Sequence, residues 1–228
     1  MATNPKLKAA SAVKRILLVD DHPLLRQGIG QLVNQQPDLV VCGEAENRAG
    51  AMSAAERTKP QLAVIDLSLK EEQGLELIKD FKVRFPDLLI LVLSMHDEQF
   101  YAERALRAGA RGYIMKREAS EKVLEAILQV LGGGVFVSGA IAQSILDKVS
   151  GRRPAGDKSE WSSLSDREME VFVLIGKGYG SNQIAKRLQL SVKTIETHRA
   201  NIRAKLHLAS GSELLQRAIG CAQQLGEM

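Results

Sequence analysis

At 228 residues, with 45% apolar residues, the chain is longer than a typical single domain and has enough apolar side chains for ordinary hydrophobic cores. No apolar run approaches the roughly 18 residues that a membrane span needs. The first thirteen residues lack the apolar stretch of an export signal, and Cys42 and Cys221 are too few and too far apart for a disulfide framework or a zinc site. We therefore expect a two-domain protein of the reducing cytoplasm.

Charge is distributed unevenly between the two parts of the chain. Residues 14–146 carry sixteen Lys and Arg against eighteen Asp and Glu, whereas residues 161–228 carry nine against six. The C-terminal part is therefore the basic one. Because the excess is small, it favours a polyanionic partner only weakly.

Four short apolar runs in the first part each end at a polar residue. They are typical of buried parallel strands and span residues 16–19, 62–65, 89–93 and 112–115. The polar residues that follow them are Asp20 and Asp21, Asp66, Ser94 and Lys116. Because the carboxyl ends of strands in an open α/β sheet meet at one edge, where sites assemble, we expect these five side chains to lie together.

Such a cluster has a definite chemistry. Three carboxylates repel one another unless a cation offsets them, and Mg²⁺, which takes oxygen ligands, suits them. Asp66 can supply a nucleophilic oxygen to a phosphoryl group, Lys116 can pair with that group, and Ser94 can donate a hydrogen bond to it. Any one acid alone is more often a turn or cap residue, but their order predicts an aspartyl phosphate site.

Residues 14 to about 136 resemble the receiver domain of two-component response regulators, since the acidic pair, VIDLSL, LSMHD and GYIMK occur in that family's order. The resemblance implies a flavodoxin-like, doubly wound parallel sheet of five strands with Asp66 as the phosphoacceptor. The implied Mg²⁺ ligands are Asp20, Asp21, Asp66 and the backbone carbonyl of Ser68. The implied switch and phosphoryl-binding residues are Ser94, Tyr113 and Lys116.

Three residues that lie beside these motifs in the sequence are interpreted separately. The family usually has proline after the lysine, whereas this chain has Arg117, before which a cis peptide bond would cost about 3 kcal/mol. His22 and His96 are more typical of rim or core histidines than of metal ligands.

The boundary between the two parts follows the receiver-like region. A helical stripe over 121–131 and three glycines come first, and a short helix is predicted over 140–148. Residues 147–158 contain Pro, two Gly and mixed charges without an apolar period, as expected of a flexible linker. We therefore predict a receiver over 14–136, a helix and linker over 137–160, and a second domain over 161–228.

Residues 162–228 are predicted to form a bundle of short helices. Ser165 and Glu168 make a capping box that starts the first helix, which ends at Gly176 to Gly180. Ser181 is expected to cap a helix over 182–188, and Ser191 a third helix running to about residue 206. Two short helices joined by a tight turn are the helix-turn-helix plan.

The third helix has two faces. Its apolar residues, which we expect to point into the bundle, are Val192, Ile195, Ile202 and Leu206. The opposite stripe, with Arg199 at its flank, consists of Lys193, Glu196, Thr197, Ala200 and Arg203. Such a stripe fits a DNA major groove, although periodicity alone is more typical of an ordinary solvated helix.

The segment LSDREMEVFVLIGKGYGSNQIAKRLQLSVKTIETHRANIRAKLHL strongly resembles the LuxR-type helix-turn-helix, an all-α DNA-binding domain, so the chain is similar to response regulators of the NarL/FixJ family. The resemblance makes 192–206 the recognition helix. The implied base-facing residues are Lys193, Glu196, Thr197 and Ala200, and the implied backbone contacts are Asn182, Thr194, Arg199 and Arg203. Some members have lysine in place of Glu196. The acid would either accept from a cytosine amino group or hold Arg199 or Arg203.

The resemblance implies a transcriptional regulator and not an enzyme. A partner sensor histidine kinase would phosphorylate Asp66, and the DNA-binding domain would then be released or dimerise to bind double-stranded promoter DNA as a homodimer. The final helix, 212–224, would pair with its twin or pack on its own bundle. An aspartyl-phosphate enzyme is disfavoured because Ser68 replaces the second acid of such enzymes. A small-ligand sensor with the same DNA-binding tail would lack the order Asp66, Ser94, Lys116.

Overall fold

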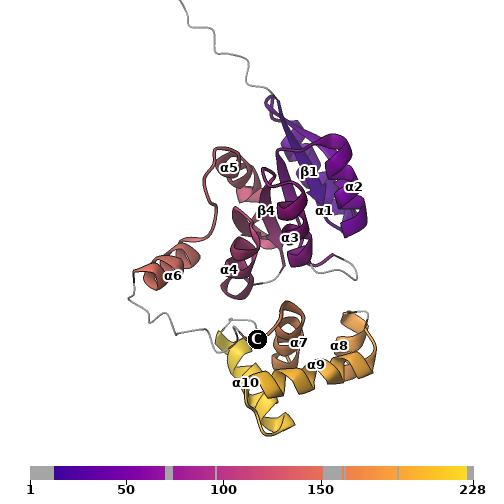
Figure 1. Ribbon diagram of the computed structural model, residues 1–228, viewed down its shortest axis with the longest axis vertical. Coiled ribbons are helices and arrows are strands. Elements are labelled where there is room, and N and C mark those ends of the chain that lie inside the picture. The colour runs from indigo at the N-terminus through magenta and orange to yellow at the C-terminus, as the bar shows by residue number, and fades with distance from the viewer. Residues whose placement is uncertain are drawn as a thin grey trace, which may run out of the picture. The chain divides into compact units, whose positions relative to one another are not determined.

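The computed structural model describes residues 13–69, 74–95, 97–150, 161, 163–188 and 190–224. They form two compact units, the first ending at Ser138 and the second beginning at Gly139. Figure 1 shows a sheet flanked by helices in the first unit and, among the described residues, only helices in the second. In the part of the chain that is described, no helix is long and apolar enough to cross a membrane.

The first unit is built on a parallel sheet of five strands in the order β2-β1-β3-β4-β5. The strands are β1 (Lys14–Val19), β2 (Leu39–Ala45), β3 (Leu62–Ile65), β4 (Leu89–Ser94) and β5 (Gly112–Met115). The winding direction reverses between β1 and β3, which makes the sheet doubly wound and confirms the predicted flavodoxin-like fold. The sequence did not reveal β2, because its run LVVCGEA is only partly apolar and mostly half-buried.

Helices cover both faces of this sheet, which is why its strands are near-continuous apolar runs. They are α1 (Pro23–Asn34), α2 (Arg48–Thr58), α3 (Gly74–Arg84), α4 (Glu98–Ala108) and α5 (Ala119–Leu131), with a short 3₁₀ turn at Lys116–Glu118. One face carries α1 and α5, whose buried Val33 and Ile127 share a core with Ile16 and Leu91 of the sheet. On the other face α3 contacts both α2 and α4.

The segment after α5 returns to the edge strand. Tyr113 N–H donates to the carbonyl of Phe136 over 2.8 Å, and Phe136 N–H donates to Arg111 over 2.9 Å. Gly112 makes this approach possible, because a side-chain carbon there would lie only 3.0 Å from the carbonyl oxygen of Phe136. The last residue of the unit, Ser138, donates a 2.6 Å hydrogen bond to Glu98 at the start of α4.

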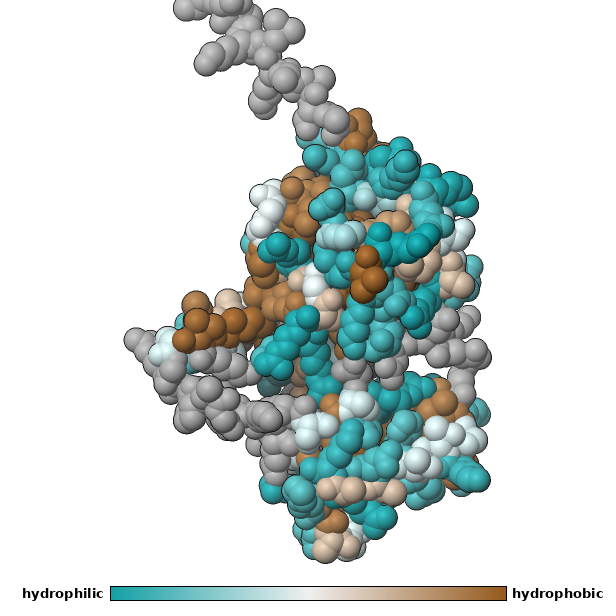
Figure 2. Space-filling model, viewed as in Figure 1, coloured by the Kyte–Doolittle hydropathy of each residue, from teal (hydrophilic) through white to brown (hydrophobic). Residues whose placement is uncertain are grey.

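The second unit contains α6 (Gly139–Val149), α7 (Asp166–Gly176), α8 (Ser181–Arg187), α9 (Val192–Lys205) and α10 (Gly211–Gln224). Leu146 and Val149 of α6 are exposed, and Figure 2 shows apolar side chains of this helix at the surface. Helix α10 packs on α7 so closely that a side-chain carbon on Gly176 would lie 2.1 Å from the Ala218 carbonyl oxygen. The buried side of α10 therefore packs on its own bundle.

Most predicted helix starts are observed, and two details are wrong. Ser165 and Glu168 form the predicted capping box, and Ser191 caps α9 by accepting the Thr194 N–H over 3.0 Å. Ser181 is not a cap but the first residue of α8, which begins after Gly180. Val192, the first residue of α9, is 43% exposed and not buried as expected, whereas Ile195 and Ile202 are buried.

The peptide bond after Lys116, the predicted phosphoryl-binding lysine, has the usual trans geometry. Among the described residues there is no cis peptide bond, so the bond between Lys116 and Arg117 is trans. Most of the predicted linker, including 151–158, lies outside the described residues, whereas 147–149 belong to α6.

Candidate functional site

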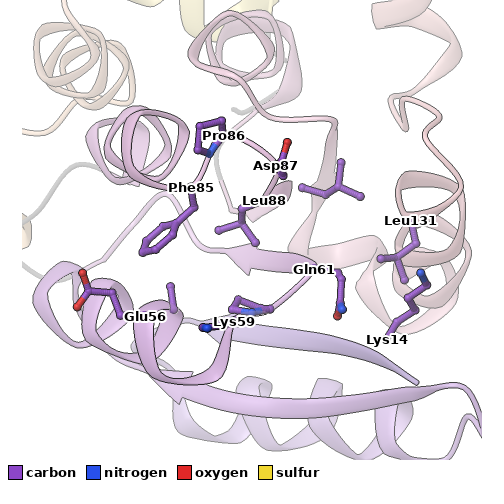
Figure 3. A pocket seen from close by; sticks show the side chains of 12 residues that line it. Lys14, Glu56, Lys59, Gln61, Phe85, Pro86, Asp87, Leu88 and Leu131 are labelled. Carbon is purple, nitrogen blue, oxygen red and sulfur yellow. The ribbon is translucent and has the colours of Figure 1, made fainter. Parts of the chain in front are cut away.

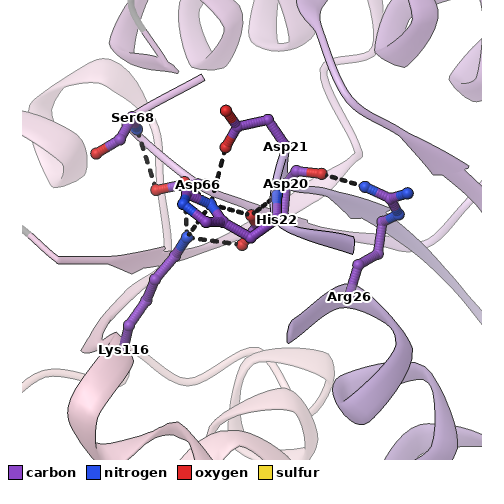
Figure 4. A network of polar contacts seen from close by, with 7 residues as sticks. All are labelled: Asp20, Asp21, His22, Arg26, Asp66, Ser68 and Lys116. Carbon is purple, nitrogen blue, oxygen red and sulfur yellow. Dashed lines mark hydrogen bonds and ion pairs between the residues drawn. The ribbon is translucent and has the colours of Figure 1, made fainter. Parts of the chain in front are cut away.

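The predicted acidic residues lie together at the carboxyl edge of the sheet. Asp20 and Asp21 follow β1, and Asp66 follows β3, the neighbouring strand. One ligand atom from each of Asp20, Asp21, His22 and Asp66 lies within 4.8 Å of the others. Asp20 and Asp66 are buried, with 5% and 1% of their surface exposed. Figure 4 shows these side chains converging from the two strand ends.

Lys116 completes the cluster from the end of β5. Its Nζ lies 2.7 Å from Asp66 Oδ2 and 2.8 Å from Asp20 Oδ2, and its side chain is 5% exposed. Burial raises the pKa of Asp66, while Lys116 and the Ser68 N–H, which donates to Asp66 Oδ1 over 3.0 Å, lower it in part. The ammonium therefore favours the charged form of this buried carboxylate.

The donor set fits a hard divalent cation. Asp21 Oδ1 is buried and accepts no hydrogen bond from the described residues, although His22 Nδ1 lies 2.9 Å away. That ring nitrogen is directed at Asp20 Oδ1, 3.0 Å away. A buried carboxylate oxygen without a donor beside two further carboxylates is what a Mg²⁺ ligand set offers.

Two residues near this cluster were not predicted as members of it. His22, with 59% of its side chain exposed, lies at the rim of the site as expected, and its Nδ1 also contacts both members of the acidic pair. Arg26, one turn into α1, donates from Nη1 to the carbonyl of Asp20 and over 2.7 Å from Nε to Glu44 on β2. The one feature of the sequence that could have indicated that these residues belong to the site is their position just after the acidic pair, at the start of a helix.

The predicted switch residues are also together. Ser94 ends β4, Tyr113 lies on the neighbouring strand β5, and both are buried. The Tyr113 hydroxyl is hydrogen-bonded to the Ser94 side chain, and burial raises the pKa of that hydroxyl although the bond to Ser94 lowers it in part. The aromatic side chain is thus directed inward, towards the edge that carries Asp66. His96 lies outside the described residues.

The helix-turn-helix region presents the predicted stripe to solvent. Lys193, Glu196, Thr197 and Ala200 of α9 are all exposed, and Asn182 is exposed at the start of α8. Arg203, the fifth residue of the predicted stripe, is half-buried, as are Thr194 and Arg199 beside the stripe. The exposed stripe is therefore available to a groove, while the opposite residues Ile195 and Ile202 hold α9 to the bundle.

Comparison with known proteins identifies both units. A model of the response regulator receiver domain matches residues 16–128, and a model of the luxR family of bacterial regulatory proteins matches residues 162–218. The oxygen regulatory protein NreC of Staphylococcus haemolyticus is 35% identical over 209 residues, which cover 90% of this chain and 96% of NreC. The chain belongs to the NarL/FixJ family of two-component response regulators. NreC of Staphylococcus carnosus is 34% identical over the same shares of the two chains.

Solved response regulators have the same architecture. RcsB from Salmonella enterica serovar Typhimurium, bound to promoter rprA in the presence of the phosphomimetic BeF3⁻, is 28% identical, with a TM-score of 0.58 over 90% of this chain and 97% of RcsB. A LuxR family response regulator from Aurantimonas sp. SI85-9A1 is 32% identical, with a TM-score of 0.56 over 61% of this chain and 99% of its own. This response regulator is a phosphorylation-controlled, DNA-binding regulator of transcription.

The receiver of this response regulator has a further hollow, away from the acidic cluster. A pocket of about 540 Å³ lies at the amino ends of β1, β3 and β4, where Lys14, Gln61 and Leu89 line it. Figure 3 shows Phe85 and Leu88 facing it. It is therefore at the sheet edge opposite the one that carries Asp66.

Proposed function

We propose that Asp66 is the phosphoacceptor of this response regulator and that a sensor histidine kinase is the donor. The observation that carries the proposal is the buried Asp66 carboxylate held 2.7 Å from Lys116 Nζ beside Asp20 and Asp21. One Asp66 oxygen attacks the phosphorus of a phosphohistidine, a P–O bond forms, the P–N bond breaks, and the kinase imidazole leaves.

The residues around Asp66 have separate roles in this transfer. We assign Mg²⁺ to Asp20, Asp21, Asp66 and the backbone carbonyl of Ser68. When bound, the ion would neutralise charge that develops on the phosphoryl oxygens. Lys116, already paired with Asp66, is placed to form an ion pair with the phosphoryl group.

The switch is the pair Ser94 and Tyr113. The Ser94 hydroxyl now shares a hydrogen bond with Tyr113 and would donate instead to a phosphoryl oxygen. This exchange alters the packing at the ends of β4 and β5 and biases the receiver between two states.

The output surface is the exposed stripe of α9. Lys193, Glu196, Thr197 and Ala200 would face bases, while Asn182, Thr194, Arg199 and Arg203 would contact the backbone. The receiver is assigned to 14–136, the linker with α6 to 137–160 and the DNA-binding domain to 161–228. RcsB dimers bound to DNA support a homodimer on two half-sites. We infer a location in the cytoplasm, because the proposed partner is promoter DNA.

The test is intact mass after incubation with acetyl phosphate. The native chain with Mg²⁺ should gain one phosphoryl group, whereas Asp66→Asn and an EDTA-treated sample should gain none. Asp38→Asn, which changes an exposed acid of the same unit, is the matched control and should behave like the native chain. A gain that persists in Asp66→Asn would assign the phosphoryl group to another residue.

A further inference from the structure

Glu196 is an unusual residue for the surface on which it lies. It is an acid, its side chain is 58% exposed, and it shares the stripe with Lys193, Thr197 and Ala200. A carboxylate that faces DNA is repelled by the phosphates and must lose water on approach. It is tolerated there only if a donor on the DNA replaces that water.

The carboxylate of Glu196 is held in place before any DNA arrives. Ser181, the first residue of α8, donates from its hydroxyl to Glu196 Oε1. The second oxygen, Oε2, lies 3.9 Å from Arg199 Nε and accepts no hydrogen bond from the described residues. One oxygen thus fixes the side chain across the helix-turn-helix, and the other remains as an acceptor.

The other exposed residues of the stripe do not offer the same hydrogen-bonding capacity as Glu196. The Thr197 hydroxyl already donates over 3.0 Å to the carbonyl of Lys193 in its own helix. Lys193 offers only donors, and Ala200 offers neither donor nor acceptor. Among the four exposed stripe residues, Glu196 is therefore the one charged acceptor, since the Thr197 hydroxyl, with its proton already donated, is a neutral and weaker acceptor.

The base edges in the major groove determine what such an acceptor can recognise. Guanine presents N7 and O6 and thymine presents O4, all of which are acceptors that repel a carboxylate. Adenine presents a donor, but its acceptor N7 lies beside it. Cytosine presents the N4 amino group alone, so it is the base that a fixed carboxylate selects.

We propose that Glu196 is a specificity-determining residue that accepts a hydrogen bond from the N4 amino group of one cytosine in each half-site, with Ser181 as its positioning residue. This inference rests on the proposed DNA-binding surface. Replacing that cytosine is expected to weaken binding roughly tenfold or more, since a good side-chain-to-base contact discriminates by about that factor.

The test is selection from a randomised DNA library with the full-length, acetyl-phosphate-treated protein. The native chain should enrich a two-half-site motif with cytosine at one position of each half. Glu196→Gln should change that position to adenine, because glutamine pairs with both N6 and N7 of adenine, and leave the remaining positions unchanged. Glu196→Ala should lose the preference at that position alone. Ser181→Ala should keep the cytosine but select it less strongly.

A matched control separates base reading from a purely structural role of Glu196. Glu213→Gln removes an exposed acid from α10 of the same unit and should select the native motif. If Glu196→Gln and Glu196→Ala also select the native motif unchanged, the inference is overturned and Glu196 only joins α8 to α9. If the native chain itself enriches no sequence while its Asp66 is phosphorylated, the proposed DNA-binding surface fails, and this inference fails with it.

Discussion

The hydroxyl of Ser138 donates a 2.6 Å hydrogen bond to Glu98 Oε1, so the last residue of the first unit is fastened to the first residue of α4. Two residues earlier, the Phe136 carbonyl accepts the N–H of Tyr113 over 2.8 Å. The chain that leads towards the second unit is therefore bonded both to α4 and to the backbone of a predicted switch residue.

Ser138→Ala should loosen this segment. Loss of one partly buried hydrogen bond to a charged acceptor removes about 1 kcal/mol of local stability, so amide hydrogen exchange at Tyr113 should accelerate about fivefold. Ser138→Thr keeps the hydroxyl and should retain the native rate. Equal exchange in the native and alanine proteins would mean that the bond to Phe136 alone closes the segment.

Asp66→Asn should stabilise the protein in metal-free buffer. Because burial raises the pKa of Asp66 above its ordinary value of 3.8, its ionisation lowers the folding stability as the pH rises through the folded-state pKa. At pH 7 the variant should melt about 4 °C higher, which corresponds to about 1 kcal/mol. Lys116 keeps its 2.8 Å contact with Asp20, so the substitution strands no buried ammonium.

The pH dependence provides the check on that prediction. The advantage of Asp66→Asn should shrink as the pH falls towards 3.8 and disappear below it, where Asp66 is protonated in both the folded and the unfolded state. Thermal unfolding in EDTA between pH 4 and pH 8 measures this, with the exposed Asp38→Asn as control. A variant that melts lower than the native chain at pH 7 would show that the attraction of Lys116 outweighs burial.

The bond between Glu168 and Lys205 should stabilise the second unit. Burial alone would raise the pKa of Glu168, but hydrogen bonds from Lys205, over 2.6 Å, and from Ser165 lower it overall. Glu168→Gln should cost about 1–2 kcal/mol at pH 7. Urea unfolding can be followed by the fluorescence of Trp161, the single tryptophan, whose ring lies 4.9 Å from that of Phe172 in the same unit.

This pair also has a pH signature with the opposite sign. Because the pKa of Glu168 is lowered in the folded state, its contribution is present above the ordinary value of 4.5 and is lost as the pH falls through the folded-state pKa. The difference in the free energy of unfolding between the native chain and Glu168→Gln should therefore become smaller at acid pH. Lys205→Met should give a similar loss at pH 7, and the double variant should lose less than the sum. Full additivity would show that the two side chains do not interact.

The sequence predicted the parts of the site that depend on strand ends. Asp66 and Lys116 come together because parallel strands place their carboxyl ends at one edge, and apolar runs mark those strands. The strand β2 was missed because its apolar run is interrupted by Gly43 and Glu44 before the strand ends. Side-chain contacts between distant elements, such as that of Arg26 with Glu44, leave no periodic signal in the sequence.

In the second unit, local capping rules also failed to predict a side-chain contact between two different elements. Ser181 is a good cap residue by type, but Gln183 accepts the Gly180 N–H over 2.9 Å, so the helix begins one residue earlier than predicted. This shift directs the Ser181 hydroxyl towards Glu196. A serine interpreted from local sequence as a cap is thus a tertiary contact, which only the approach of α8 and α9 determines.

Arg26 should control the affinity of the acidic pair for Mg²⁺. Its guanidinium, on a side chain that is 12% exposed, holds the Asp20 carbonyl and contacts Glu44 over 2.7 Å. It therefore fixes the turn that carries two of the three carboxylates without contacting the ion itself. Residues that orient metal ligands in this way typically contribute 10-fold to 100-fold to affinity, so Arg26→Gln should weaken Mg²⁺ binding about tenfold.

Calorimetric titration of the full chain with Mg²⁺ measures this effect directly. Glu44→Gln removes only the outer partner, which is 46% exposed, and should weaken binding by less than Arg26→Gln does. Arg84→Gln breaks a surface ion pair of the same chemistry, with Glu56, and should leave the affinity unchanged. If Arg26→Gln binds Mg²⁺ as tightly as the native chain does, the turn after β1 is held by its other bonds, chiefly that of the His22 N–H to Asp20 Oδ1 over 2.8 Å.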